Sequence, residues 1–246
     1  IKVIEIAKKY KKLDKKLISG LNFEDPLLAS NVAKKMIKAG ADAILIFPPF
    51  SWSQGISHEM IYQHHKVICN KIYKPVFIYQ SSIYSGHLSY KKELLKKLLK
   101  IKNVIGVKEG SWDFKNYVNN YKFLKKIKKD FLVMASGDEH LYPCFKYASD
   151  GSQVSLAAIT PDKIVELIRL IENKQYSEAK KLDKKLLILA KNIYGKYPPN
   201  FATARIKYCL KVLKKIPSDL MRSSIFLNTN EKIQLRRSLK ALGCKL

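Results

Sequence analysis

The stretch Asn103-Val104-Ile105-Gly106-Val107-Lys108-Glu109-Gly110 places a lysine at the end of an apolar run. Continuous apolar runs are typical of central strands in parallel sheets, because helices cover both faces of such sheets. Parallel α/β folds carry their active sites at the carboxyl ends of the strands. Burial disfavours an ammonium, so an amine at this place can become neutral and attack a carbonyl to form a Schiff base. The alternative is a lysine that extends from the strand end into solvent.

Short apolar runs alternate with lysine-rich amphipathic segments along the first two thirds of the chain. The apolar runs, which predict strands, are residues 16–21, 41–47, 75–80, 103–108, 131–135 and 152–156. The amphipathic segments, which predict helices, are residues 27–39, 56–72, 90–100, 114–128 and 164–172. This alternation predicts βα units and a parallel α/β sheet. No GxGxxG or GxxxxGK[ST] motif follows a strand, which disfavours the nucleotide-binding versions of such folds.

The last third of the chain predicts helices only. Thr160-Pro161-Asp162 indicates a helix start with proline at its first position. Later helices are predicted at residues 176–194, 200–214 and 230–242, with a cap in residues 228–232 (NTNEK) and a rigid linker in residues 197–200 (YPPN). Residues 1–172 therefore predict a βα domain, either a (β/α) barrel or a doubly wound sheet, and residues 173–246 predict a C-terminal helical extension.

Five segments carry a family resemblance that covers nearly the whole chain. They are residues 44–55 (ILIFPPFSWSQG), 75–80 (PVFIYQ), 104–110 (VIGVKEG), 135–138 (ASGD) and 151–155 (GSQVS). Together they resemble the dihydrodipicolinate synthase / N-acetylneuraminate lyase family of class I aldolases, which are (β/α)8 TIM barrels. The resemblance implies a lyase that needs no cofactor, works as a homo-oligomer (dimer or tetramer), and forms a Schiff base with a 2-keto acid, classically pyruvate.

The same resemblance assigns roles to individual residues. Lys108 corresponds to the Schiff-base lysine, and Tyr79 to a tyrosine that relays protons at the imine carbon. A nearby cation favours the ionised form of a phenol, which suits such a relay at neutral pH; the alternative for Tyr79 is a core aromatic. Gly137 and Val154 match positions whose backbone lines the keto-acid pocket, although ordinary turn and strand roles remain open for both.

Three residues depart from the family pattern. Tyr84 stands where the synthase branch has an arginine that grips a substrate carboxylate, and a phenol offers neither charge nor a bidentate fork. Phe50 replaces a tyrosine and cannot relay protons, and Gln80 replaces an asparagine. We therefore expect substrate contacts at Tyr84 and Phe50, but not authentic dihydrodipicolinate synthesis. The expected reaction is aldol cleavage or dehydration of another keto acid or sugar acid; the alternative is a non-catalytic or degenerate barrel paralogue.

The resemblance also predicts that this chain lacks the first two strands of the barrel. Residues 1–12 read as the end of the second helix, and residues 16–21 as the third strand of eight. A six-stranded remnant cannot close a barrel and leaves two open edges. A fragment of a longer sequence is expected, which by itself would be inactive, and a shortened natural variant is the alternative.

Composition limits the remaining possibilities. The 246 residues suffice for one large domain, and the sequence shows neither a membrane-span-length apolar stretch nor an apolar signal region. Four scattered cysteines predict free thiols and a cytoplasmic protein. His64 and His65 are expected on different faces of a helix, and no metal site is predicted.

The charge of the chain invites a nucleic-acid hypothesis. The formal net charge is +27, from 42 lysines and 5 arginines against 20 acidic residues. The lysines are spread through every predicted helix rather than gathered in one stripe, and no nucleic-acid-binding motif accompanies them. We therefore interpret them as solvated helix faces and expect a small-molecule substrate, no nucleic acid and no membrane.

Overall fold

The computed structural model describes residues 1–195, 201–222 and 225–246. Two compact units divide the chain. The first holds Ile1–Ser136 and Ala148–Ser152, and the second holds Gly137–Tyr147 and Gln153–Leu246. The predicted linker at residues 197–200 and the first residue of the predicted helix 200–214 lie outside the described residues. The division at residues 172 and 173 stays a prediction.

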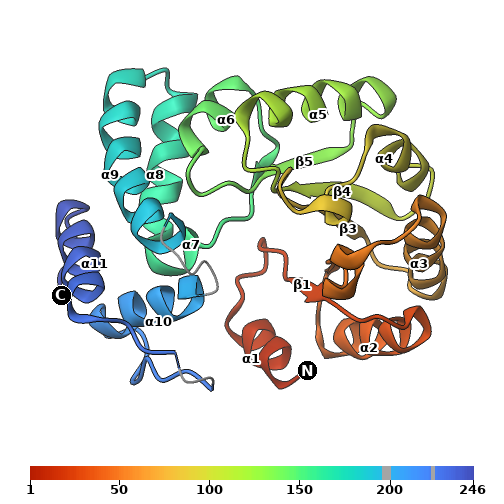
Figure 1. The fold of residues 1–246 in the computed structure, drawn as a ribbon, viewed down its shortest axis with the longest axis horizontal. Coiled ribbons are helices and arrows are strands. Elements are labelled where there is room, and N and C mark those ends of the chain that lie inside the picture. Colours follow the sequence, from red (N-terminus) through yellow and green to blue (C-terminus); the bar gives the residue numbers. More distant parts are fainter. Residues whose placement is uncertain (196–200, 223–224) are drawn as a thin grey trace. The chain divides into compact units, whose positions relative to one another are not determined.

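Six parallel strands, paired in chain order, form the sheet of the first unit (Figure 1). They are β1 (Ile18–Leu21), β2 (Ala43–Ile46), β3 (Val76–Gln80), β4 (Val104–Glu109), β5 (Leu132–Ala135) and β6 (Gly151–Ser152). The parallel α/β class and the first five predicted strands are confirmed. Among the described residues, β1 and β6 are the edges of this sheet.

The sixth predicted strand, residues 152–156, is wrong beyond Ser152. The backbone N–H groups of Leu156 and Ser155 donate to the Asp138 carboxylate, at 2.8 and 3.4 Å. The chain then turns into a short helix, α7 (Leu156–Ile159). Because a carboxylate accepts the first N–H groups, a helical turn replaces the ladder that a longer strand would have formed.

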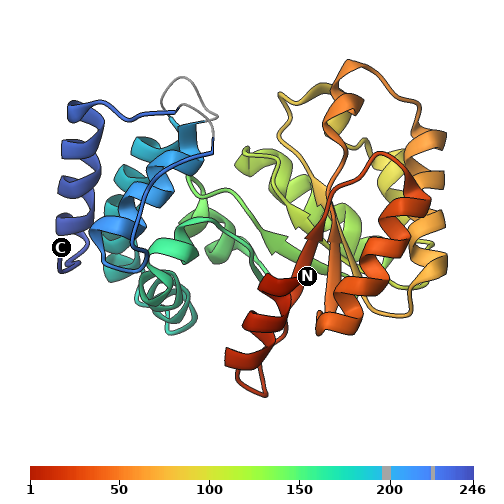
Figure 2. The same cartoon turned by 90° about the horizontal axis from the view of Figure 1, so that it is seen from below.

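Five helices of the first unit follow or precede its strands: α1 (Lys2–Tyr10), α2 (Pro26–Ala39), α3 (His58–Lys71), α4 (Lys92–Leu98) and α5 (Phe114–Ile127). Helices α2 to α5 lie side by side in chain order along the outer face of the sheet (Figures 1 and 2). Local chemistry sets their ends. The Asp25 side chain caps the first turn of α2, with Pro26 at its first position, and Gly40 ends it with a φ of 119°.

The two faces of the sheet are packed differently. Outward-facing aliphatic side chains are fully buried beneath the helices: Ile44, Val76, Ile78, Val104, Val107 and Val133. Burying each such side chain contributes about 1.5–3 kcal/mol. The inner face carries a smaller cluster of Ala43, Leu45 and Phe77, with half-buried Phe47 and Tyr79 against it. The rigid outer layer therefore fixes the strands, and the half-buried inner layer is the face available to a ligand.

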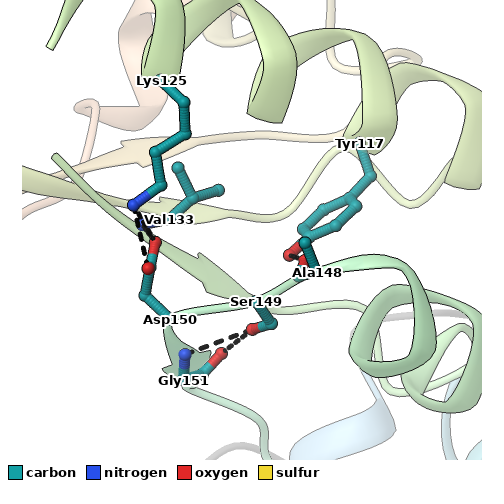
Figure 3. Close-up of polar contacts among 7 residues, drawn as sticks. All are labelled: Tyr117, Lys125, Val133, Ala148, Ser149, Asp150 and Gly151. Atoms are coloured by element: carbon teal, nitrogen blue, oxygen red, sulfur yellow. Dashed lines mark hydrogen bonds and ion pairs between the residues drawn. The ribbon is translucent and has the colours of Figure 1, made fainter. Parts of the chain in front are cut away.

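The short strand β6 is held in place by polar contacts with α5 and β5 (Figure 3). The Asp150 carboxylate pairs with the Lys125 ammonium at 2.8 Å and accepts a hydrogen bond from the Val133 N–H at 2.8 Å. The Tyr117 hydroxyl donates to the Ala148 carbonyl at 2.8 Å. With only two residues in β6, these side chains supply anchoring that the strand ladder alone does not.

The second unit is helical, as predicted for the end of the chain. Its helices are α6 (Leu141–Tyr147), α7, α8 (Pro161–Glu172), α9 (Tyr176–Tyr194), α10 (Ala202–Val212) and α11 (Thr229–Ala241), with α9 lying beside α8 and α11 (Figure 2). The predicted cap is confirmed, because Asn228 and Glu231 form a capping box at the start of α11. No helix in the described ranges is long and apolar enough to cross a membrane.

Helix α3 packs on a 3-10 turn, η1 (Phe50–Gln54), through edge-on contacts of aromatic rings. His64 and His65 are both buried, with ring centroids 5.8 Å apart, although the sequence predicts different faces. Trp52 contacts His64 edge-on at 5.0 Å, and His65 contacts Tyr90 at 5.9 Å. Burial lowers the pKa of His65 from 6.5 to about 4, so its ring is neutral at pH 7.

This burial predicts acid-sensitive stability. The folded pKa of His65 lies below its unfolded value. The stability that the neutral, buried ring gives is therefore fully present above pH 6.5 and is lost as the pH falls toward 4. The loss is at most about 1.4 kcal/mol per pH unit. His65→Leu should therefore flatten the pH dependence of the denaturant midpoint between pH 7 and 4.5. Ile68→Val, on the same helix, should lower stability equally at each pH. An unchanged pH slope in His65→Leu would contradict the prediction.

Candidate active site

The inner face of β3 and β4 brings Tyr79 and Lys108 together. The two residues are register partners at the carboxyl ends of these parallel strands. The Lys108 Nζ lies 5.3 Å from the centroid of the Tyr79 ring and 5.4 Å from the centroid of the Phe47 ring. The two rings lie 4.9 Å apart at 44°. Lys108 therefore does not extend freely into solvent; two aromatic faces hold its amine by cation–π attraction.

Two glycines, Gly106 within β4 and Gly110 just after it, flank Lys108 and make room for this arrangement. A Cβ at Gly106 would lie 2.5 Å from the Phe77 ring and 2.7 Å from the Leu132 carbonyl oxygen. A Cβ at Gly110 would lie 3.0 Å from the Tyr79 ring and 3.1 Å from its hydroxyl. The glycine–x–lysine–x–glycine spacing thus lets aromatic rings approach the strand on both sides of the amine.

The protonation of Tyr79 differs from the sequence-based expectation. Burial raises the pKa of the Tyr79 phenol, and the negative Glu109 carboxylate raises it further, whereas a hydrogen bond with Ser81 opposes the shift. The expected shift was toward the ionised phenolate. A neutral phenol can still both donate and accept a hydrogen bond, so the pair places the Lys108 amine beside a group that can pass on a proton.

The other predicted contacts in the first unit lie outside this cluster. Phe50, at the start of η1, is 80% exposed, and Tyr84, in the loop after β3, is 87% exposed. Gln80 is buried, and its side chain accepts from the Tyr90 N–H at 3.1 Å and donates to the Ser89 hydroxyl at 3.0 Å. Gln80 thus fixes the loop that carries Tyr84. Substrate contacts by Phe50 and Tyr84 remain predictions.

Gly137 and Val154 belong to the second unit. The Gly137 carbonyl accepts a hydrogen bond from the His140 N–H at 2.8 Å, and the Val154 carbonyl accepts from the Ala157 N–H at 3.3 Å. Asp138 joins the two segments through its bonds to Ser155 and Leu156. Their predicted place along a keto-acid pocket stays a prediction.

Phe47 and Glu109 are neighbours of Lys108 that the sequence analysis did not assign. Phe47 continues the inward-facing positions of β2, so its alternation with Ala43 and Leu45 was a usable signal. Glu109 is 2% exposed at the end of β4. Across the described ranges, no group of three or more His, Cys, Asp or Glu residues could hold a metal ion. The four cysteines are free thiols, as predicted.

A family model described as the dihydrodipicolinate synthetase family matches residues 1–242. The chain belongs to this family. Its members are lyases of the class I aldolase type, and the predicted enzyme class is thereby confirmed.

Relatives with assigned names resemble nearly the whole chain. The 4-hydroxy-tetrahydrodipicolinate synthase of Syntrophobacter fumaroxidans is 24% identical over 245 residues, which is 98% of this chain and 80% of that protein. The protein of the same name from Neisseria meningitidis serogroup B is 25% identical, over 98% of this chain and 79% of its own length.

Solved structures of the family share the fold. The dihydrodipicolinate synthase of Thermotoga maritima superposes with a TM-score of 0.87 at 20% identity, over 99% of this chain and 81% of that one. The chloride-inhibited dihydrodipicolinate synthase of Acinetobacter baumannii, solved with pyruvate, gives a TM-score of 0.84 at 21% identity, over 99% of this chain and 80% of that one.

The glycines beside Lys108 give a stability prediction. Gly106→Ala should destabilise the protein by about 1–3 kcal/mol, because the new methyl group meets both a ring and a backbone oxygen that cannot both move away. Gly137→Ala is the matched control, since its nearest neighbour would lie at an ordinary 3.6 Å. Chemical denaturation of both variants measures the difference; equal midpoints would contradict the packing argument.

Proposed function

We propose that Lys108 forms a Schiff base with the carbonyl carbon of a 2-keto acid of the pyruvate class. The observation that carries this proposal is the Lys108 amine held between Phe47 and Tyr79 at the carboxyl end of β4. The amine adds to the carbonyl, and loss of water gives an iminium. Because an iminium withdraws electrons, the adjacent carbon can lose a proton or a carbon–carbon bond can break.

Tyr79 is proposed to carry the protons of these steps. Its raised pKa keeps the phenol neutral at pH 7, so the hydroxyl can give a proton to the carbinolamine hydroxyl, which leaves as water, and the phenolate can then take the proton lost from the carbon next to the iminium. The presence of pyruvate in the related Acinetobacter baumannii enzyme supports a keto acid of this size.

The second substrate is proposed to lack a second carboxylate. By the family resemblance, Tyr84 corresponds to an arginine that grips that group in the synthase branch, and neighbouring Ile83 and Ser85 add no charge. Losing a charge-assisted pair costs about 1.5–3 kcal/mol. We therefore propose that the enzyme cleaves or dehydrates a neutral-tailed or hydroxylated 2-keto acid, in preference to the synthase reaction for which its relatives are named.

The active form is proposed to be a closed barrel within a cytoplasmic homo-oligomer. The six parallel strands, paired in chain order, fit part of the sheet of such a barrel. The four free cysteines fit a reducing compartment.

The first test is covalent trapping at Lys108. Incubation of the full protein with pyruvate and borohydride should give a reduced adduct on Lys108, located by peptide mass spectrometry. Lys108→Ala should give none, because the imine needs a primary amine at that position. Adducts only on scattered surface lysines would overturn the Schiff-base proposal and favour the alternative, a degenerate barrel paralogue without catalysis.

The second test concerns substrate choice. The kcat/KM for condensation of aspartate semialdehyde with pyruvate should be roughly tenfold to a hundredfold lower than the kcat/KM for cleavage of a neutral-tailed keto acid. This factor corresponds to the free energy of the missing charge pair. Tyr84→Arg should restore part of the condensation, and Tyr84→Phe, which removes only the hydroxyl, should not. Efficient condensation in the unmodified protein would return it to the synthase branch.

A further inference from the structure

We infer that Glu109 is a positioning residue, whose buried carboxylate ties the end of β4 to α5 and so holds the Lys108 amine against Tyr79. The inference rests on the Schiff-base function proposed above. Alternation along β4 turns Glu109 to the face opposite Lys108, so it does not contact the reacting atoms. It acts through the backbone that the two residues share.

The Glu109 carboxylate accepts hydrogen bonds both from helix α5 and from the turn that follows β4. The Asn120 side chain of α5 donates to Oε1 at 2.9 Å, and the Ser111 hydroxyl donates to Oε2 at 3.0 Å. The Ser111 backbone N–H approaches the same oxygen at 3.4 Å. A carboxylate buried this completely would be costly without donors, so these bonds hold the strand end in one place.

The turn that follows Glu109 is strained and needs such a tie. Trp112 has a φ of 57°, in the left-handed region that a side chain disfavours. Asp113 then starts α5 by accepting the Asn116 N–H at 2.6 Å. Strain of this kind persists where surrounding contacts over-determine the backbone, and it clusters at functional sites. The bonds from Ser111, the residue before Trp112, to Glu109 are contacts of this kind, and Glu109 is next to Lys108 in β4.

The β3 side of the site is tied in the same way. Gln80 is the register partner of Glu109, just as Tyr79 is the partner of Lys108. Gln80 holds Ser89 and Tyr90, and its carbonyl accepts the Gly110 N–H at 2.8 Å. An outward polar pair therefore supports the inward reactive pair across the two strands.

The Glu109 charge also acts on the proton relay. Lys108 of β4 faces Tyr79 on the inner side of the sheet, and Ser81 after β3 bonds to it; Glu109 acts from the opposite face, and its charge raises the pKa of the phenol. The groups that face Glu109 are Asn120 of α5, Ser111, and Asp113 after β4. Burial raises the pKa of Glu109, and the bonds from Asn120 and Ser111 oppose that rise. Removing the charge should therefore lower the pKa of Tyr79.

The experiment measures the rate at which pyruvate and borohydride label Lys108, as a function of pH, in the full protein. Glu109→Gln should lower this rate roughly tenfold to a hundredfold and shift its alkaline limb to lower pH. Glu109→Asp, which keeps the charge on a shorter side chain, should lower the rate and leave the alkaline limb in place. In a Tyr79→Phe background, Glu109→Gln should no longer shift that limb.

Two further variants separate positioning from general stability. Asn120→Ala removes one hydrogen bond and leaves the carboxylate, so it tests the same tie if Glu109→Gln does not fold. Asn103→Ala is the matched control: its amide donates to the carbonyls of Cys69, Ile72 and Lys74 at the opposite end of β4. Asn103→Ala should lower the melting temperature without a change in labelling rate per folded molecule.

The outcomes are distinct. Labelling of wild-type Lys108 with an unchanged rate and pH profile in both Glu109→Gln and Asn120→Ala would overturn this inference alone. Equal losses in Asn103→Ala and Asn120→Ala would also overturn it, because general destabilisation would then explain them. No label at Lys108 in the wild-type protein would overturn the proposed function, and this inference with it.

Discussion

The register between β3 and β4 is the constraint on which the rest of the site depends. It pairs Tyr79 with Lys108 and Gln80 with Glu109. Because side chains alternate across a strand, one pair faces the inner layer and the other faces the helices. A slip of one residue would bury the amine under α5 and turn a carboxylate toward the aromatic rings. The fully buried outer valines and isoleucines make that slip costly, so core packing and chemistry are set by one alignment.

Much of the fold follows from the sequence, because its signals are local. Apolar runs bounded by turns marked five strands, and proline, asparagine and glutamate marked the starts of α8 and α11. The sixth strand failed for a non-local reason. Asp138, seventeen residues before Ser155, accepts its N–H and starts a helical turn. Nothing in the sequence of residues 152–156 indicates that the Asp138 carboxylate will bind their N–H groups.

The candidate site was predictable in its chemistry and less so in its surroundings. Lys108 stood out because it ends an apolar run, and Tyr79 through family resemblance. The pKa direction of Tyr79 could not be read from sequence, since burial and the Glu109 charge outweigh the effect expected from a nearby cation. Phe47 also required the structure, because β2, β3 and β4 must be aligned before its ring meets Lys108. The neighbours of Lys108 and the pKa of Tyr79 depend on contacts between strands, which the sequence of one strand does not reveal.

The two tryptophans of this chain lie beside the α3 histidines and in the turn after β4. Trp52 lies edge-on to His64, beside the neutral His65, and Trp112 sits in the left-handed turn that follows Glu109. A protonated imidazole quenches indole fluorescence, whereas a neutral one does so much less. The emission of Trp52 therefore reports the charge of the α3 core, and the emission of Trp112 reports the order of the turn beside Lys108. In single-tryptophan variants of the protein, fluorescence would report the protonation of the α3 core and the order of the turn separately.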